Sequence, residues 1–122
     1  MRSICDTCAI ACVCPDRSFS MAKCDRYRDH CKVLKKAVST YGAETQKWVL
    51  VGEIGELLDA IADHKRGRCT VDHIAEEIAD VLICLQQLQY IYECQNAVML
   101  WHEKKIRRLA QKLATGEENT CQ

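Results

Sequence analysis

Apolar residues along most of the chain recur at the three- and four-residue spacing of amphipathic helices. This spacing predicts four helices, over residues 20–40, 43–65, 71–93 and 96–114. Gly42 and Gly67 lie just beyond the first two helices, and Thr70 is a suitable N-cap for the third. No segment alternates between apolar and polar residues as a strand does. The pattern therefore predicts an all-α fold, a four-helix bundle whose short connections place successive helices antiparallel.

The second and third predicted helices have the clearest apolar stripes. The stripe residues are Leu50, Val51, Ile54, Leu57, Leu58 and Ile61 on the second, and Ile74, Ile78, Val81, Leu82, Leu85, Leu88 and Tyr92 on the third. At about 100° per residue, Glu53 and Glu77 lie to one side of their own stripes, in the same rotational sense. On the third helix this flank continues through Cys84 and Ile91. Because the flank mixes acidic and apolar residues, we expect it to be partly buried, against a second subunit.

The composition is that of one ordinary domain of 122 residues. The 17 basic and 17 acidic residues balance, which argues against a dedicated binder of nucleic acid or of a membrane surface. No apolar run is long enough to span a membrane, and the N-terminus is too short and polar for a signal peptide. We expect a cytoplasmic protein with a cysteine-rich segment over 1–20, a helical domain over 21–114 and a polar tail over 115–122.

The ten cysteines are concentrated near the N-terminus. Cys5-x-x-Cys8 is followed at once by Cys12-x-Cys14, which places four thiols within ten residues. Thiolate pairs of the first kind are common in structural Zn²⁺ sites, although the second spacing is less usual. Reduced or disulfide-linked thiols are the alternative. The spacings do not match those of iron–sulfur proteins.

Two acidic pairs indicate the chemistry of the chain. Glu53-Ile-Gly-Glu56 and Glu77-Ile-Ala-Asp80 lie on neighbouring predicted helices, and the i,i+3 spacing places both acids of a pair on one side. Either pair alone would usually be a solvated face. Two pairs on matched flanks instead indicate a cluster of hard oxygen ligands, suited to Mg²⁺ or Mn²⁺. Such a cation usually serves a phosphate substrate.

These motifs resemble those of the all-α nucleoside triphosphate pyrophosphatases, the MazG-like superfamily. In that family Glu-Glu-x-x-Glu on one helix is followed by Glu-x-x-Asp on the next, and here the motifs begin at Gly52 and Glu77. The segments YGAETQKWVLVGEIGELLDAI, VDHIAEEIADVLICLQQL and WHEKKIRRLAQKL are similar to small phage and Gram-positive members. The similarity covers residues 33–113. Gly52 is a departure, because the family has a glutamate there that belongs to its metal and water-activating cluster.

The resemblance implies an enzyme that cleaves nucleoside or deoxynucleoside triphosphates to monophosphate and pyrophosphate. It implies Mg²⁺ as cofactor, with Mn²⁺ as an alternative, and a homodimer or homotetramer. The implied metal ligands are Glu53, Glu56, Glu77 and Asp80; Glu53 or Glu76 would be the base, and Lys105 and Arg108 would contact phosphates.

Other readings of the sequence stay open. A cysteine-rich metal-binding or redox-responsive helical adaptor without enzymatic activity is the main alternative. A di-iron bundle needs Glu-x-x-His pairs, and the sequence has none. Trp48 and Trp101 are predicted to be core residues in preference to platforms that stack on a base. His64, His73 and His102 are interpreted as isolated surface or cap residues.

Overall fold

The computed structural model describes the backbone of residues 25–116 and the side chains from residue 29 onward. This part of the chain contains α-helices and no strand. The helices are α2 (Asp25–Tyr41), α3 (Ala43–Lys65), α4 (Val71–Ile91) and α5 (Gln95–Thr115). The all-α class predicted from the sequence is confirmed, and α3 has the bounds predicted for it. The predicted third helix is two residues too long, because α4 ends at Ile91.

Local sequence explains where α3 and α4 begin. Gly42 has a φ of 93°, in the region that favours glycine, so the chain turns sharply between α2 and α3. Gly67 has a φ of 73° in the short connection to α4. The hydroxyl of Thr70 then accepts a hydrogen bond from the backbone N–H of His73 at 3.2 Å, which is an N-cap interaction.

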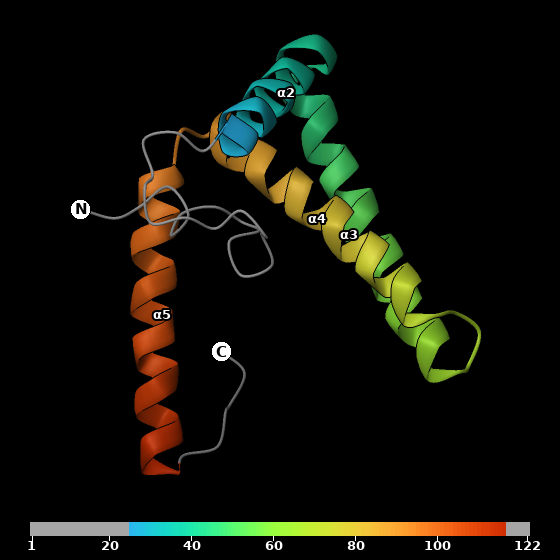
Figure 1. The fold of residues 1–122 in the computed structure, drawn as a ribbon, viewed down its shortest axis with the longest axis vertical. Helices are drawn as coiled ribbons and strands as arrows, with labels where there is room; N and C mark the ends of the chain where they lie inside the picture. Colours follow the sequence, from blue (N-terminus) through green and yellow to red (C-terminus); the bar gives the residue numbers. More distant parts are fainter. Residues whose placement is uncertain (1–24, 117–122) are drawn as a thin grey trace. The chain divides into compact units, whose positions relative to one another are not determined.

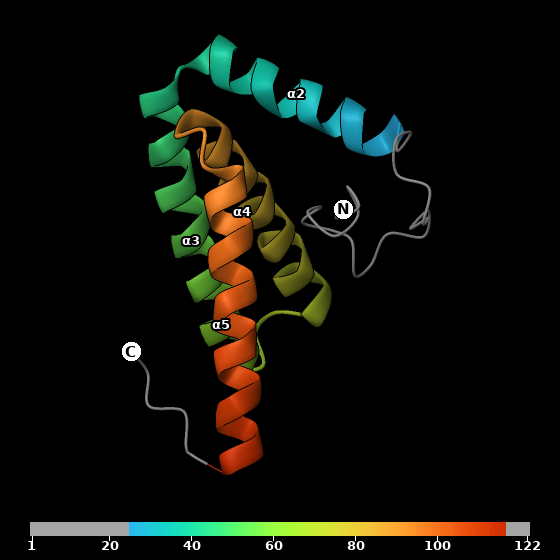
Figure 2. The same cartoon turned by 90° about the vertical axis from the view of Figure 1, so that its left-hand side faces the viewer.

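The described part of the chain forms two compact units, and the boundary between them follows Tyr92. In the first unit, α3 and α4 form an antiparallel hairpin and α2 packs against both helices near the open end of the hairpin (Figures 1 and 2). Tyr90 on α4 donates a hydrogen bond from its hydroxyl to the Cys31 sulfur on α2 at 2.8 Å. Lys35 lies over the ring of the same tyrosine, 5.2 Å from its centroid. These contacts attach α2 to α4.

The second unit contains α5, in which side chains one turn apart contact one another. Arg107 pairs with Glu103 at 2.9 Å, and Lys104 lies over the Trp101 ring at 4.9 Å. Gly116 ends the helix in the left-handed conformation with a φ of 71°. None of the residues of α5 is buried.

The hairpin interface differs from the apolar stripes predicted from the sequence. On α3 the buried residues are Gln46, Leu50 and Ala60, and on α4 they are Glu77, Cys84 and Gln87. Much of each stripe is exposed, including Val51, Ile54, Leu58 and Ile61 on α3, Ile78 and Leu85 on α4, and Tyr92 just beyond the end of α4. The predicted flank is therefore partly buried, as expected, since Glu77 and Cys84 are buried while Glu56 is exposed. This burial arises within the single chain, where α3 packs against α4, whereas a second subunit was expected to cover the flank.

The two helices pair through a heptad-spaced seam. On α3 the seam residues are separated by alternating steps of four and three residues: Gln46, Leu50, Glu53, Leu57 and Ala60. On α4 the buried residues Glu77 and Cys84 are seven residues apart, which is the same heptad spacing. One set of exposed apolar residues follows these seam positions by one residue: Val51, Ile54, Leu58 and Ile61 on α3, and Ile78 and Leu85 on α4. Since the helices are antiparallel, the α3 and α4 members of this set face the same side of the hairpin. None of the described helices is long and apolar enough to cross a membrane.

Candidate metal centre

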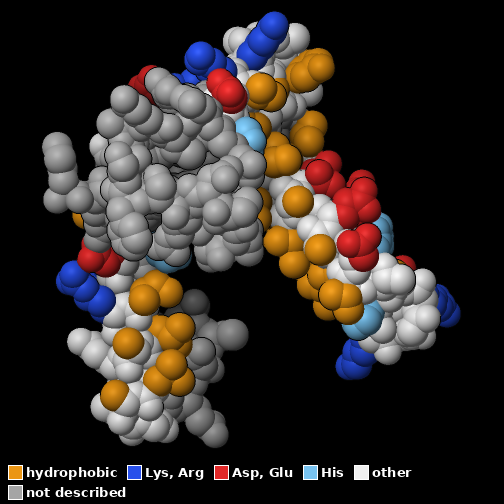
Figure 3. All heavy atoms as spheres, in the orientation of Figure 1, with side chains coloured by type: hydrophobic (Ala, Val, Ile, Leu, Met, Phe, Trp, Pro, Cys, Tyr) orange, Lys and Arg blue, Asp and Glu red, His pale blue; other side chains and the backbone are white. Residues whose placement is uncertain are grey.

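The hairpin brings together acids that are far apart in sequence. Glu53 and Glu56 on α3 and Glu77 on α4 each offer a carboxylate oxygen, and these three oxygens lie within 4.8 Å of one another. Glu53 and Glu77 occupy seam positions, while Glu56 precedes the seam residue Leu57. The acids gather on one side of the hairpin and apolar side chains on the other (Figure 3). Three of the four predicted metal ligands therefore form one cluster.

Glu77 is the buried member of this cluster. Its side chain is 7% exposed, and its Oε2 atom has no hydrogen-bond partner. A buried carboxylate oxygen without a partner is costly, because it has lost water and gained nothing in exchange. Its neighbours Glu53 and Glu56 are also acids, so they add repulsion. This arrangement fits a bound cation better than it fits an empty helical seam.

Asp80 adds negative charge beside the cluster. Partial burial of Glu53, together with the charges of Asp80, Glu56 and Glu77, raises the pKa of the Glu53 carboxyl above its ordinary value. Burial also raises the pKa of the Cys84 thiol, with smaller contributions from Glu53 and Asp80. Cys84 is therefore held as a neutral thiol within the seam. The repulsion among the acids is the kind that a divalent cation relieves.

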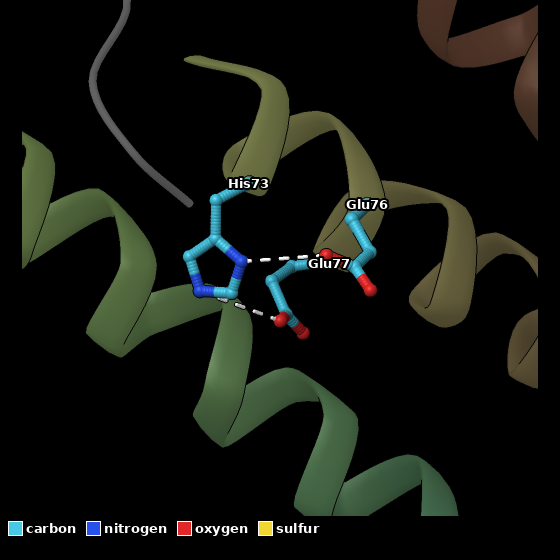
Figure 4. Close-up of side chains that lie close together, drawn as sticks. All are labelled: His73, Glu76 and Glu77. Atoms are coloured by element: carbon cyan, nitrogen blue, oxygen red, sulfur yellow. Dashed lines mark ion pairs between the residues drawn. The ribbon is translucent and has the colours of Figure 1, made fainter. Parts of the chain in front are cut away.

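His73 lies beside this cluster, although its position in the sequence had been interpreted as isolated. It is not isolated: Nδ1 lies 3.5 Å from Glu76 Oε2, and Nε2 lies 3.7 Å from Glu77 Oε1 (Figure 4). The signal was present in the sequence, because residues three and four apart on a helix share a face. His64 also has a partner, since its Nδ1 lies 2.9 Å from the backbone oxygen of Cys69.

The remaining residues that the sequence suggested for the site are not members of the carboxylate cluster. Glu76 is exposed and lies beside His73. Lys105 and Arg108 are exposed on α5, in the second compact unit. Trp48 and Trp101 are 72% and 58% exposed, so the prediction that they are core residues is wrong for the single chain.

Gly52 leaves space where the family motif has a glutamate. It lies within α3 and is exposed, and a Cβ atom built there meets no atom within 4 Å. The backbone therefore offers no steric reason for glycine at this position. Since glycine is unfavourable inside a helix, the residue also weakens α3 locally.

The predicted zinc ligands Cys5, Cys8, Cys12 and Cys14 lie outside the described residues. Among the described cysteines, Cys31, Cys69, Cys84 and Cys94 are free thiols. The Cys69 thiol donates a hydrogen bond to the backbone oxygen of Ala60 at 3.1 Å, which joins the interhelical connection to α3.

Comparison with known proteins gives one match. A family model described as the MazG nucleotide pyrophosphohydrolase domain matches residues 42–119. This region contains both acidic motifs and the whole of α3 and α4. No curated protein and no solved structure matches the chain.

Proposed function

The chain belongs to the MazG nucleotide pyrophosphohydrolase family, and from this premise we propose that it is a Mg²⁺-dependent nucleoside triphosphate pyrophosphatase of the cytoplasmic nucleotide pool. Its substrate would be a ribo- or deoxyribonucleoside triphosphate, and its products the monophosphate and pyrophosphate. The observation that carries the proposal is the buried, unpartnered oxygen of Glu77 beside two further carboxylates. An all-carboxylate donor set is of the hard-oxygen kind that suits Mg²⁺ and Mn²⁺.

The proposal assigns the acidic residues to two tasks. Glu53, Glu56, Glu77 and Asp80 would hold Mg²⁺, which when bound neutralises charge on the phosphate oxygens. Glu53 is also our first candidate for the base, because its carboxylate lies in the cluster beside the position proposed for Mg²⁺ and the attacking water. Glu76, which is exposed beside the cluster, is the second candidate.

The reaction consumes one water molecule. The water oxygen bonds to one of the two phosphorus atoms that share the oxygen bridging the α and β phosphates, and the bond from that phosphorus to the bridging oxygen breaks. The bridging oxygen leaves with the other phosphorus, which separates monophosphate from pyrophosphate, and the base accepts the proton that the water loses. Lys105 and Arg108 are proposed to donate hydrogen bonds to phosphate oxygens, a task that suits the planar donor group of arginine.

We also propose that the protein acts as a homo-oligomer, a dimer or a tetramer. The hairpin exposes a set of large apolar side chains on the side away from the acids (Figure 3). Exposed apolar patches of this kind mark interaction surfaces in folded proteins. A second copy of the same face is an apolar partner of matching character, and its binding would leave the acidic side open to substrate.

The proposed activity is tested by incubating the purified protein with a panel of nucleoside and deoxynucleoside triphosphates in Mg²⁺. Pyrophosphate and orthophosphate are measured separately. We expect pyrophosphate and monophosphate, abolished by EDTA and reduced at least about 100-fold in Asp80→Asn and Glu77→Gln. Glu44→Gln is the matched control, since it lies on α3 about 13 Å along the helix from Glu53.

A further variant tests whether glycine at position 52 lowers turnover. Gly52→Glu restores the family motif in open space and is expected to raise turnover. Full turnover by Asp80→Asn would show that the assigned site is wrong. Absence of pyrophosphate release from every nucleotide, by the natural protein and by Gly52→Glu alike, would contradict the proposed function and favour the cysteine-rich adaptor.

A further inference from the structure

We propose that His73, Glu76 and Glu77 form a second cation position beside the carboxylate cluster, and that its imidazole ligand adapts it to Mn²⁺. This inference deepens the proposed function, on which it rests for the task of the shared residue Glu77. The sequence motifs of the family contain only acids, so they do not indicate a nitrogen ligand.

The three side chains converge on one side of α4. Each offers one ligand atom, and these atoms lie within 4.8 Å of one another. Figure 4 shows the His73 ring beside both carboxylates, with the Glu77 carboxylate between α4 and α3. The N-cap hydrogen bond from the His73 backbone to Thr70 fixes the first turn of α4, and with it the base of the imidazole side chain.

The contacts are longer than direct hydrogen bonds between charged groups. The two nitrogen–oxygen distances are 3.5 and 3.7 Å, whereas charge-assisted hydrogen bonds are about 2.8 Å. The two distances join different nitrogens of the ring, so they describe two loose ion pairs and do not describe the ligands of one ion. The imidazole is therefore not tightly hydrogen-bonded to either carboxylate, and one of its nitrogens is available to bind a cation that the carboxylates share.

The buried carboxylate of Glu77 is the observation that indicates a cation beside these three side chains. It is nine-tenths buried, its Oε1 faces His73, and its Oε2 has no partner. Because Glu77 also belongs to the cluster with Glu53 and Glu56, one carboxylate can serve two cation positions. Carboxylates shared in this way occur in two-metal phosphate enzymes, whose ions lie about 4 Å apart.

The donor set selects the class of ion. Mg²⁺ favours oxygen ligands and retained water, whereas an imidazole nitrogen suits transition metals. Two carboxylates with one imidazole therefore favour Mn²⁺ over Mg²⁺. Mn²⁺ is also the better experimental probe, because Zn²⁺ would bind to thiolates in a chain with ten cysteines.

The test uses electron paramagnetic resonance of Mn²⁺ added to the full chain, purified without a histidine tag. Pulsed measurements detect a nitrogen nucleus bonded directly to Mn²⁺. We expect this nitrogen signal in the natural protein and its loss in His73→Gln, together with at least a ~10-fold weaker affinity for one Mn²⁺. His102→Gln, an exposed histidine on α5, is the matched control and is expected to retain both.

Absence of the nitrogen signal from the natural protein, or its persistence in His73→Gln, overturns the proposal. Pyrophosphate release with Mg²⁺ is measured on the same natural protein. A nitrogen signal without nucleotide hydrolysis would support the Mn²⁺ position and contradict the proposed function. Hydrolysis without a nitrogen signal would support the function and overturn the Mn²⁺ position.

Discussion

At the scale of single residues, Glu53 shows how neighbours change the properties of a carboxylate. It lies at a seam position, so it is partly removed from water, and three other acids act on it. Both effects disfavour the charged form and raise its pKa. The folded chain without metal therefore binds a proton at Glu53 more tightly than the unfolded chain does.

This difference predicts how stability depends on pH when metal is removed. The contribution of Glu53 to the free energy of unfolding is fully favourable below its ordinary pKa of 4.5, where the carboxyl is protonated in the folded and the unfolded chain. This contribution is lost as pH rises through the raised pKa of the folded chain. In EDTA, we expect Glu53→Gln to gain stability over the natural protein as pH increases from about 4 to about 7. Urea unfolding at several pH values measures the difference.

Asp29→Asn is the control for this series, because Asp29 is exposed on α2. Its difference from the natural protein is expected to stay level over the same range. A difference for Glu53→Gln that does not change with pH would contradict the prediction. Saturating Mg²⁺ is expected to reverse the trend, since a bound cation favours the charged carboxylate.

At the scale of elements, the α3–α4 seam combines polar and apolar residues at heptad spacing. One buried hydrogen bond crosses it outside the acidic cluster: Gln46 Nε2 donates to Gln87 Oε1 at 3.2 Å. Both side chains are buried, so each satisfies a group that would otherwise lack a partner. The pair ties the start of α3 to the last turns of α4 and thereby fixes the register of the hairpin.

A double-mutant cycle tests this contact. Gln46→Leu and Gln87→Leu are each expected to lower the free energy of unfolding by about 1–3 kcal/mol, because each leaves a buried amide unpaired. The double variant is expected to lose less than the sum, with a coupling of about 1 kcal/mol. Urea unfolding gives all three values, with the exposed Gln111→Leu as control. Strictly additive losses would argue against the hydrogen bond.

At the scale of the whole molecule, the hairpin of the first unit has two unlike sides. Six exposed apolar residues follow seam positions by one residue, namely Val51, Ile54, Leu58 and Ile61 on α3 and Ile78 and Leu85 on α4, while Glu56 and Glu76 precede seam positions by one. With the helices antiparallel, these sets lie on opposite sides. A face of this apolar character is unfavourable in water, and we propose that a second copy covers it.

The oligomer prediction is tested by placing a charge in that face. The natural protein is expected to show two or four times the mass of one chain by light scattering after gel filtration. Ile54→Glu is expected to shift the mass toward one chain, because it would bury a charge against apolar side chains. Val33→Glu, an exposed apolar position on α2, is the control. A natural protein of single-chain mass would contradict the prediction.

The sequence alone determined the helices, because apolar spacing, Gly42 and the Thr70 cap act locally. It also determined the acidic motifs, since residues three apart on a helix share a side whatever surrounds them. The resemblance carried by those motifs led to the family that the comparison shows. Whether these acids bind metal and hydrolyse nucleotides stays a prediction.

Only the tertiary structure decided which side of each helix is covered. Both the apolar stripe and the acidic flank of α3 could pack against a neighbour, and periodicity alone favoured the stripe. The pairing of α3 with α4 buried Glu77 and left Ile54 exposed, because burial depends on which helix lies alongside. The spacing of His73 and Glu77 already placed both on one face of α4, but only the tertiary structure showed that this glutamate is buried.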